Sequence, residues 1–542
     1  MNKLIIGTKD FFLTKQKTII SSALVVGSML LFSRFFGFLR YRILAGYFDK
    51  SQLDIFFASF RIPDFVFEIL VTGAVSSAFI PIFIKYQKDK NKLNENISSI
   101  INIVSIVFFC FLVILFLLAD KIIPLMTPGF SKEKIQIITY YSKLLLIGQL
   151  PFMFFASFLT GLGQANKIFL VSAIAPIIYN LAIILITIMF AGSHNLTAPI
   201  IGVMLGSVLL FIIQMPLMFH SGYSYIPILK ITRALKDFFK MIVPRVITVI
   251  STKIDATIDL LLTSMLGAGS YTIFYLAQHL QLFPVSILGI SFGQASLPYL
   301  SEVYQNKKYE KFKKIIADSI LSILFLTIPL MAFFIFARTP LVRLFFGGDK
   351  FDWDATVQTA LTLSYFAFSI PLHSVYYFIT RCFYAFLDTK TPFIISVICV
   401  VLNTVLSLIF IFILHLPVWS LGISFSISIS VNVILLLIVL YKKIRGLNRR
   451  LLVVETSKIL TSTFIASFFV YFEMKLFDGL IFDTTRTINV FFLLVTGALT
   501  FLIGYFFLSW FFKVEEMKTI INFLKKARFY KKRVVEIYTD VE

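Results

Sequence analysis

Charged side chains interrupt an apolar stretch near the start of the chain. Those between residues 33 and 81 include Arg34, Arg40, Arg42, Arg61, Asp64 and Glu68. A charge at the centre of a bilayer is costly unless it faces protein or water. The pattern therefore predicts a polar cavity within a helical bundle, and the excess of arginine indicates an anionic cargo.

The composition is that of a membrane protein. Of 542 residues, 58% are hydrophobic and 14% are charged. Apolar stretches long enough to cross roughly 30 Å of hydrocarbon recur along the chain, and none shows the two-residue alternation of a β-barrel. The sequence predicts an all-α polytopic protein with about fourteen transmembrane helices, near 22–46, 54–83, 97–119, 135–161, 168–191, 198–219, 238–266, 271–299, 315–337, 356–386, 392–414, 418–441, 457–476 and 488–512.

The net charge of +22 follows the predicted topology. With the N-terminus inside, the lysine-rich and arginine-rich segments 85–92, 230–240, 307–314 and 442–450 all fall on the cytoplasmic side. The outer loops are sparse and mixed in charge, as at Lys350 among aspartates. This is the positive-inside pattern, so both termini are predicted to be cytoplasmic and the basicity does not indicate nucleic-acid binding.

Nothing in the sequence favours an enzyme. The three cysteines, Cys110, Cys382 and Cys399, lie within predicted helices without metal-ligand spacing, and no nucleotide-binding or hydrolase motif occurs. Residues 1–20 are polar and basic, and no small-residue cleavage site follows, so the first helix is predicted to be retained. We predict a transporter without a cofactor.

Two internal repeats predict the architecture. The segment from Thr160 resembles that from Phe383, and the segment from Asp54 more weakly resembles that from Thr272. Both pairs are six helices apart, which indicates two pseudo-symmetric six-helix lobes around a central cavity, able to rock in alternating access. The predicted parts are a cytoplasmic segment 1–20, an N-lobe 21–222, a C-lobe 223–446, two extra helices in 447–513, and a basic amphipathic tail 514–542.

Prolines within the predicted helices indicate kinks or breaks. They are Pro63, Pro151, Pro244, Pro284 and Pro371.

The ordered motifs resemble the MurJ (MviN) family of lipid II flippases. SRFFGFLR, DIFFASFRIPD and GAVSSAFIP precede RALKDFFKMIVPRVI, FPVSILGISFGQASLP and RCFYAFLDTKTP, over roughly residues 20–510. The resemblance implies the fold of the multidrug/oligosaccharidyl-lipid/polysaccharide exporter superfamily. It also implies that the two extra helices form a groove for a polyprenyl tail.

By position, the resemblance implies substrate contacts for five residues: Arg34, Arg40, Asp54, Arg61 and His279. His279 replaces an arginine usual in the family, and it is largely neutral at pH 7 unless an anion favours its charged form. For Arg40 the alternative is a side chain that extends to the membrane interface, and for His279 it is a packing role.

Helix 238–266 contains buried carboxylates. Asp255 and Asp259 share one helix face, and carboxylates in a membrane must pair with a cation or carry a proton. The resemblance implies a sodium or proton site formed by Asp255, Asp259 and Asn403. The alternative is an ion pair of these aspartates with Lys253 or Arg245.

The implied function is translocation of lipid II, the undecaprenyl-pyrophosphate-linked peptidoglycan precursor, from the inner to the outer leaflet of the bacterial cytoplasmic membrane. Its partners would be this lipid, membrane lipids and proteins of cell-wall synthesis. Two alternatives stay open: transport of another polyprenyl-linked glycan, and a non-transporting scaffold for cell-wall synthesis.

Overall fold

The computed structural model describes residues 19–68 and 78–517 of the chain. Throughout these ranges the regular elements are helices, as the sequence predicts. A helix satisfies its own backbone hydrogen bonds, which is what an apolar chain in lipid requires. The predicted tail 514–542 and the segment 1–20 lie almost wholly outside the described residues.

The chain forms two compact units. The first comprises the described residues up to Thr272 together with Phe345–Ala355, and the second comprises Ile273–Leu344 and the described residues from Thr356 onward. This division does not test the predicted lobes 21–222 and 223–446, which stay a prediction.

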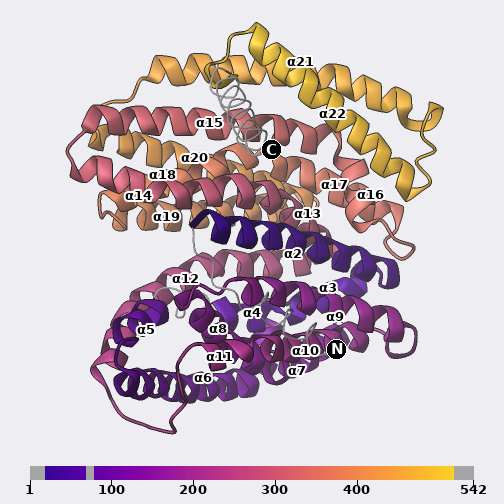
Figure 1. Ribbon diagram of the computed structural model, residues 1–542. Coiled ribbons are helices and arrows are strands. Elements are labelled where there is room, and N and C mark those ends of the chain that lie inside the picture. Colours follow the sequence, from indigo (N-terminus) through magenta and orange to yellow (C-terminus); the bar gives the residue numbers. More distant parts are fainter. Residues whose placement is uncertain (1–18, 69–77, 518–542) are drawn as a thin grey trace, which may run out of the picture. The chain divides into compact units, whose positions relative to one another are not determined.

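The first unit is built mainly from helices α2 to α12 (Figure 1). Within it α9 packs against α2 and α10, α8 packs against α10, and α6 packs against α7 and α12. The bounds are α2 Ile19–Tyr47, α3 Lys50–Ser59, α4 Arg61–Phe67, α5 Ile80–Tyr86, α6 Lys90–Met126, α7 Lys132–Gly148, α8 Leu150–Ala165, α9 Leu170–His194, α10 Thr197–Gln214, α11 Pro216–His220 and α12 Arg233–Met265.

The second unit contains most of the remaining helices. Here α18 packs against α14, α15 and α20, and α21 lies beside α22 (Figure 1). The bounds are α13 Ser270–Pro284, the π-helix η3 Val285–Ile290, α14 Ser291–Gln305, α15 Tyr309–Phe336, α16 Arg338–Phe346, α17 Trp353–Ala367, α18 Ile370–Ala385, α19 Lys390–Leu408, the π-helix η4 Ile409–Ile413, α20 Trp419–Lys443, α21 Arg449–Leu480 and α22 Thr487–Phe511. Helices α13, α16 and α17 cross the division.

Ten helical stretches in the described residues are long and apolar enough to cross a membrane. They correspond to ten of the fourteen predicted spans, and the count of fourteen stays a prediction. The other four are α2, the segment from α3 to α5, α12, and the pair α17 and α18. Helix α12 carries many charged residues, and 69–77 in the second predicted span is not described.

The predicted single span 356–386 is two helices. Helices α17 and α18 have 15 and 16 residues, and α18 begins with Pro371 in its first turn. Proline cannot donate the backbone hydrogen bond that would continue α17. A second predicted kink is also present, since the π-helix η3 follows Pro284 directly.

A charged cap joins two helix ends in the second unit. The Asp388 carboxylate, between α18 and α19, accepts hydrogen bonds from Thr391 N at 3.0 Å, Thr391 Oγ1 at 2.7 Å and Lys443 Nζ at 2.7 Å. Burial opposes ionisation, but the bonds from Lys443 and Thr391 outweigh it and lower the pKa of Asp388 to about 2. The ionised carboxylate therefore stabilises this junction.

We expect Asp388→Asn to lower the thermal midpoint at pH 7 by a few degrees, because a helix cap contributes about 1 kcal/mol. The unfolded carboxyl titrates near pH 3.9, so the parent loses this stability as the pH falls from about 4 towards 2. The difference in thermal midpoint between the parent and Asp388→Asn should therefore become smaller over that pH range. Thermal unfolding in detergent measures it, with the exposed Glu310→Gln as the control. Equal midpoints at pH 7 would contradict the assignment.

Candidate functional site

Asp54 is a buried acidic residue of the first unit. Its side chain is fully buried on α3. It accepts hydrogen bonds from Gly269 N at 2.5 Å, Thr272 N at 2.8 Å and Thr272 Oγ1 at 2.9 Å. Gly269 directly precedes α13 and Thr272 lies in its first turn, where the helix dipole also favours an anion. The carboxylate thus fixes this helix start to α3.

Local sequence explains why Asp54 points there. Asp49 caps α3 by accepting from Ser51 N and Gln52 N, each at 2.8 Å, and Gln52 Oε1 accepts from Asp49 N at 3.2 Å. This reciprocal capping box fixes the start of the helix and hence the direction of the residues that follow.

A lysine one turn earlier holds an acidic loop. Lys50 Nζ donates to Asp354 Oδ2 at 2.6 Å and lies 3.4 Å from Asp352 Oδ2. Both carboxylates are largely exposed, so each ion pair contributes little on its own. Together they fix the segment Phe345–Ala355, which we term the acidic strap, to the N-terminal end of α3.

The acidic strap also packs against α2. Phe345 contacts Phe38 with ring centroids 4.7 Å apart, and Phe346 contacts Tyr41 edge to face at 6.3 Å. At Gly348 the backbones meet so closely that an added Cβ would lie 2.6 Å from Gly46 Cα. Any larger residue at Gly348 would therefore move the strap away from α2.

Arg61, Asp255 and Asp259 form a group in the first unit that we term the charged cluster. The Nε and Nη2 atoms of Arg61 donate to Thr257 Oγ1 of α12 at 3.3 and 3.1 Å. Asp259, on the same helix and 5% exposed, is within electrostatic reach of Arg61 and Asp255. Buried Tyr271 is within reach of Arg61, Asp259 and Asp54. The structure therefore gathers one arginine and three predicted aspartates in the first unit.

The two arginines of α2 differ in their surroundings. Arg34 is exposed and Arg40 is half-buried, with its guanidinium carbon 4.7 Å from the centroid of the Tyr41 ring. Arg40 also acts electrostatically on buried Tyr179 of α9. A half-buried arginine stacked on an aromatic ring keeps its planar donors directed and its charge only partly hydrated.

His279 belongs to the second unit. Its Nδ1 lies 2.8 Å from the Tyr275 carbonyl oxygen one turn earlier, and its ring lies on Tyr275 with centroids 4.0 Å apart. A carbonyl only accepts, so Nδ1 carries a proton. Gripping an anion through Nε2 would then require the imidazolium form.

The predicted cation site is divided between the units. Asp255 and Asp259 lie in the first unit, and Asn403, 5% exposed, lies in the second. In the part of the chain that is described, no group of three or more His, Cys, Asp or Glu side chains is arranged to hold a metal ion. The site stays a prediction, and the Lys253 side chain lies outside the described residues.

Comparison with known proteins decides the family. A family model described as "Lipid II flippase MurJ" matches residues 45–492. The chain belongs to the MurJ family. The resemblance inferred from the ordered motifs is thereby confirmed, and the family consists of transporters, not enzymes.

Relatives in the MurJ family cover most of the chain. The probable lipid II flippase MurJ of Rickettsia prowazekii (strain Madrid E) is 26% identical over 72% of this chain and 78% of its own. The lipid II flippase MurJ of Thermosipho africanus (strain TCF52B) is 27% identical over 72% of this chain and 80% of its own.

Solved structures show the same fold. A lipid II flippase MurJ in an inward closed conformation superposes with a TM-score of 0.73 at 24% identity, covering 90% of this chain and 99% of its own. An inward-facing multidrug resistance MATE transporter of the MOP superfamily gives 0.67 at 14% identity, covering 78% and 98%. The predicted superfamily fold is confirmed.

Sequence analysis missed the partners of the charged residues. It singled out Asp54 and Arg61 but neither Thr272 nor Thr257, and it placed the acidic strap only as a mixed outer loop. It also overlooked a buried polar group in the second unit, where Gln281 Nε2 donates to Ser369 Oγ at 2.8 Å and lies 3.2 Å from His373 Nδ1. The clustering of Asp352 and Asp354 was the one available signal for the strap.

Replacing Asp54 tests whether its three hydrogen bonds hold the helix start. Asp54→Asn keeps the shape, but its amide nitrogen cannot accept, so at least one buried donor loses its partner. We expect a destabilisation of about 1–3 kcal/mol, read as a lower thermal midpoint in detergent. Asp120→Asn, which breaks only the exposed pair with Lys143, should shift it by less than about 1 kcal/mol. Equal effects of the two variants would disprove the special role of Asp54.

Proposed function

We propose that this protein translocates lipid II from the inner to the outer leaflet of the bacterial cytoplasmic membrane by alternating access. The observation that carries the proposal is the match of the MurJ family model to residues 45–492. The other two functions considered from the sequence gain no support, since each relative reported above is named a lipid II flippase.

The physical task fits the charged cluster. The pyrophosphate of lipid II cannot enter hydrocarbon, whereas its polyprenyl tail can stay in lipid. Guanidinium groups replace the water around a pyrophosphate with paired hydrogen bonds. We assign this role to Arg40 and Arg61, with Arg34 and His279 as further contacts that the family positions imply.

The aspartates give Arg61 a second role. In the absence of cargo, Asp259 offsets the charge of Arg61 electrostatically, and Thr257 occupies two of its donors. An arriving pyrophosphate competes for the same guanidinium. Because Arg61 can exchange Asp259 and Thr257 for the pyrophosphate and back again, the charged cluster can bind an anion firmly and still release it.

We infer that Asp54 and the acidic strap lie at the outer surface. This assignment rests on the predicted topology, in which the basic segments 85–92 and 230–240 are cytoplasmic. The start of α3 and the end of α12, just before Gly269, would then both be outer ends. We therefore assign Asp54, Lys50 and the strap to an outer gate. Opening it breaks two exposed ion pairs and three buried hydrogen bonds.

In this proposal, the hydrogen bonds of Asp54 therefore stabilise the closed gate. Coupling to sodium or protons through Asp255, Asp259 and Asn403 stays a prediction, as does a tail groove in α21 and α22. Proteins of cell-wall synthesis remain predicted partners.

Complementation tests the function. Expressed in a bacterium depleted of its own lipid II flippase, the parent chain should restore growth, and Arg40→Ala should fail while reaching the membrane in equal amount. Arg450→Ala, at an exposed position on α21, is the matched control and should behave as the parent. Proteoliposomes with labelled lipid II then measure the rate directly. Equal rates for Arg40→Ala and the parent would refute the role of Arg40, and no transport by the parent would refute the function.

Removing Lys50 tests the outer gate. We expect Lys50→Ala to raise the outward-open population by up to about thirty-fold, because it removes two exposed ion pairs that contribute at most about 1 kcal/mol each. A reporter cysteine at Ala58, which is 3% exposed, measures this by labelling with an impermeant maleimide after the three native cysteines are replaced by serine. Lys132→Ala, another exposed outer lysine, should leave labelling unchanged. Unchanged labelling in Lys50→Ala would argue against the gate.

A further inference from the structure

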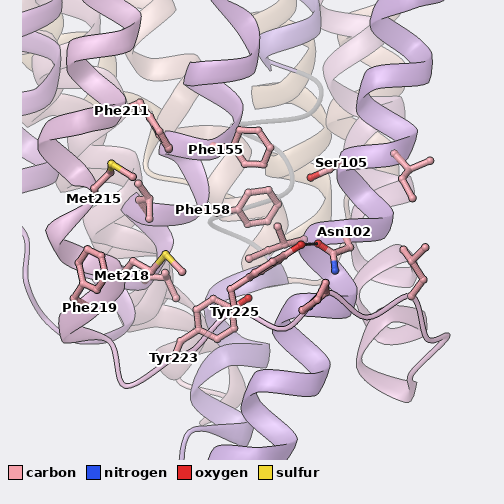
Figure 2. Close-up of a pocket in the computed structure, with 16 residues that line it drawn as sticks. Asn102, Ser105, Phe155, Phe158, Phe211, Met215, Met218, Phe219, Tyr223 and Tyr225 are labelled. Atoms are coloured by element: carbon pink, nitrogen blue, oxygen red, sulfur yellow. Dashed lines mark hydrogen bonds between the residues drawn. The ribbon is translucent and has the colours of Figure 1, made fainter.

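The first unit contains an apolar cavity of about 580 Å³, away from the charged cluster (Figure 2). Its walls come from α6, α8, α10, α11 and the connection between α11 and α12. Phe155 and Phe158 line one side, and Phe211, Met215 and Met218 line another (Figure 2). The volume is within the roughly 300–1,000 Å³ range of small-ligand sites.

Most of the polar side chains around the cavity have hydrogen-bond partners within the protein, whereas the buried Ser105 hydroxyl, which also lines it, has none among the described residues. Tyr225 Oη donates to Asn102 Oδ1 at 3.0 Å, and Asn102 Nδ2 donates to the Ile228 carbonyl at 2.9 Å. Tyr223 Oη lies 2.7 Å from Ser98 Oγ. Apart from the single hydroxyl of Ser105, the cavity therefore presents aromatic and aliphatic surface to an occupant. That chemistry fits a hydrocarbon chain.

The rim of the cavity is apolar and leads directly into a basic surface. Phe219 and Leu229 line it and are 79% and 68% exposed. Lys230 follows immediately and pairs with Glu95 at 2.6 Å. The exposed side chains of Arg233, Lys236 and Lys240 come next, against Asp237, which pairs with Lys85. The net charge beside the rim is therefore positive, which complements an anionic head group.

We propose that this cavity binds one acyl chain of an anionic phospholipid from the cytoplasmic leaflet, with its head group over residues 230–240. The proposal rests on the topology given under the proposed function. The surrounding helices are long and apolar enough to lie in the membrane, so phospholipid chains are the molecules at highest concentration around the opening. A bound chain would join the α11–α12 connection to α6 and α8.

Photolabelling of the full-length protein in nanodiscs tests this. The probe is a phosphatidylglycerol with a diazirine in one acyl chain, and mass spectrometry locates the labelled peptides. We expect labels within 101–106 and 211–229, at least five-fold more than with the phosphatidylcholine probe of the same chain. Met218→Trp, which fills the cavity, should reduce them about ten-fold. Leu205→Trp, on the exposed face of α10, is the matched control and should not.

Other outcomes overturn the proposal. Undiminished labelling in folded Met218→Trp excludes the cavity, and equal labelling by both head groups excludes the anionic preference. Stronger labelling by a polyprenyl-phosphate probe would assign the cavity to the tail of the cargo. If Met218→Trp is unstable, Arg233→Glu with Lys236→Glu leaves the cavity intact and must abolish the preference. A parent inactive in lipid II transport but labelled as expected would refute only the function.

Discussion

The cost of burying Asp54 is the constraint on which the first unit depends. A fully buried carboxylate is tolerated only when donors surround it, and here three come from Gly269 and Thr272. The two backbone donors are free for Asp54 because α13 begins at that point, and the third donor is the Thr272 hydroxyl. The position of α13, the burial of Asp54 and the geometry of the loop before α13 therefore depend on one another. The weaker contacts of the acidic strap stabilise the same end of α3.

Polar groups in this protein follow two different rules. In the charged cluster, Arg61 shares its interactions with Thr257 and Asp259, and such shared interactions can be exchanged for a ligand. Around the apolar cavity, Tyr223, Tyr225 and Asn102 instead have fixed hydrogen-bond partners within the protein. The cavity surface therefore stays mainly apolar although polar side chains lie close to it.

Much of this could be predicted from the sequence. The helical class follows from apolar run lengths, and the two kinks at Pro284 and Pro371 follow from the missing backbone donor. Arg61 and Asp54 could be singled out because lipid does not tolerate them. Their partners could not, since Thr257 is 196 residues from Arg61 and Thr272 is 218 residues from Asp54. A threonine can lie in an apolar helix at little energetic cost, so nothing in the sequence distinguishes Thr257 or Thr272 from other threonines. Only the packed structure shows what they bind.

The acidic strap also has a consequence for biosynthesis. Residues Phe345–Ala355 belong to the first unit, although the chain on both sides of them belongs to the second. When the first 272 residues have been synthesised and inserted, Asp352 and Asp354, the partners of Lys50, have not yet been made. Phe345 and Gly348, which pack against α2, are also still missing. The first unit is therefore completed only after more than seventy further residues have entered the membrane. Until the acidic strap has been synthesised, α2 and α3 therefore lack these contacts.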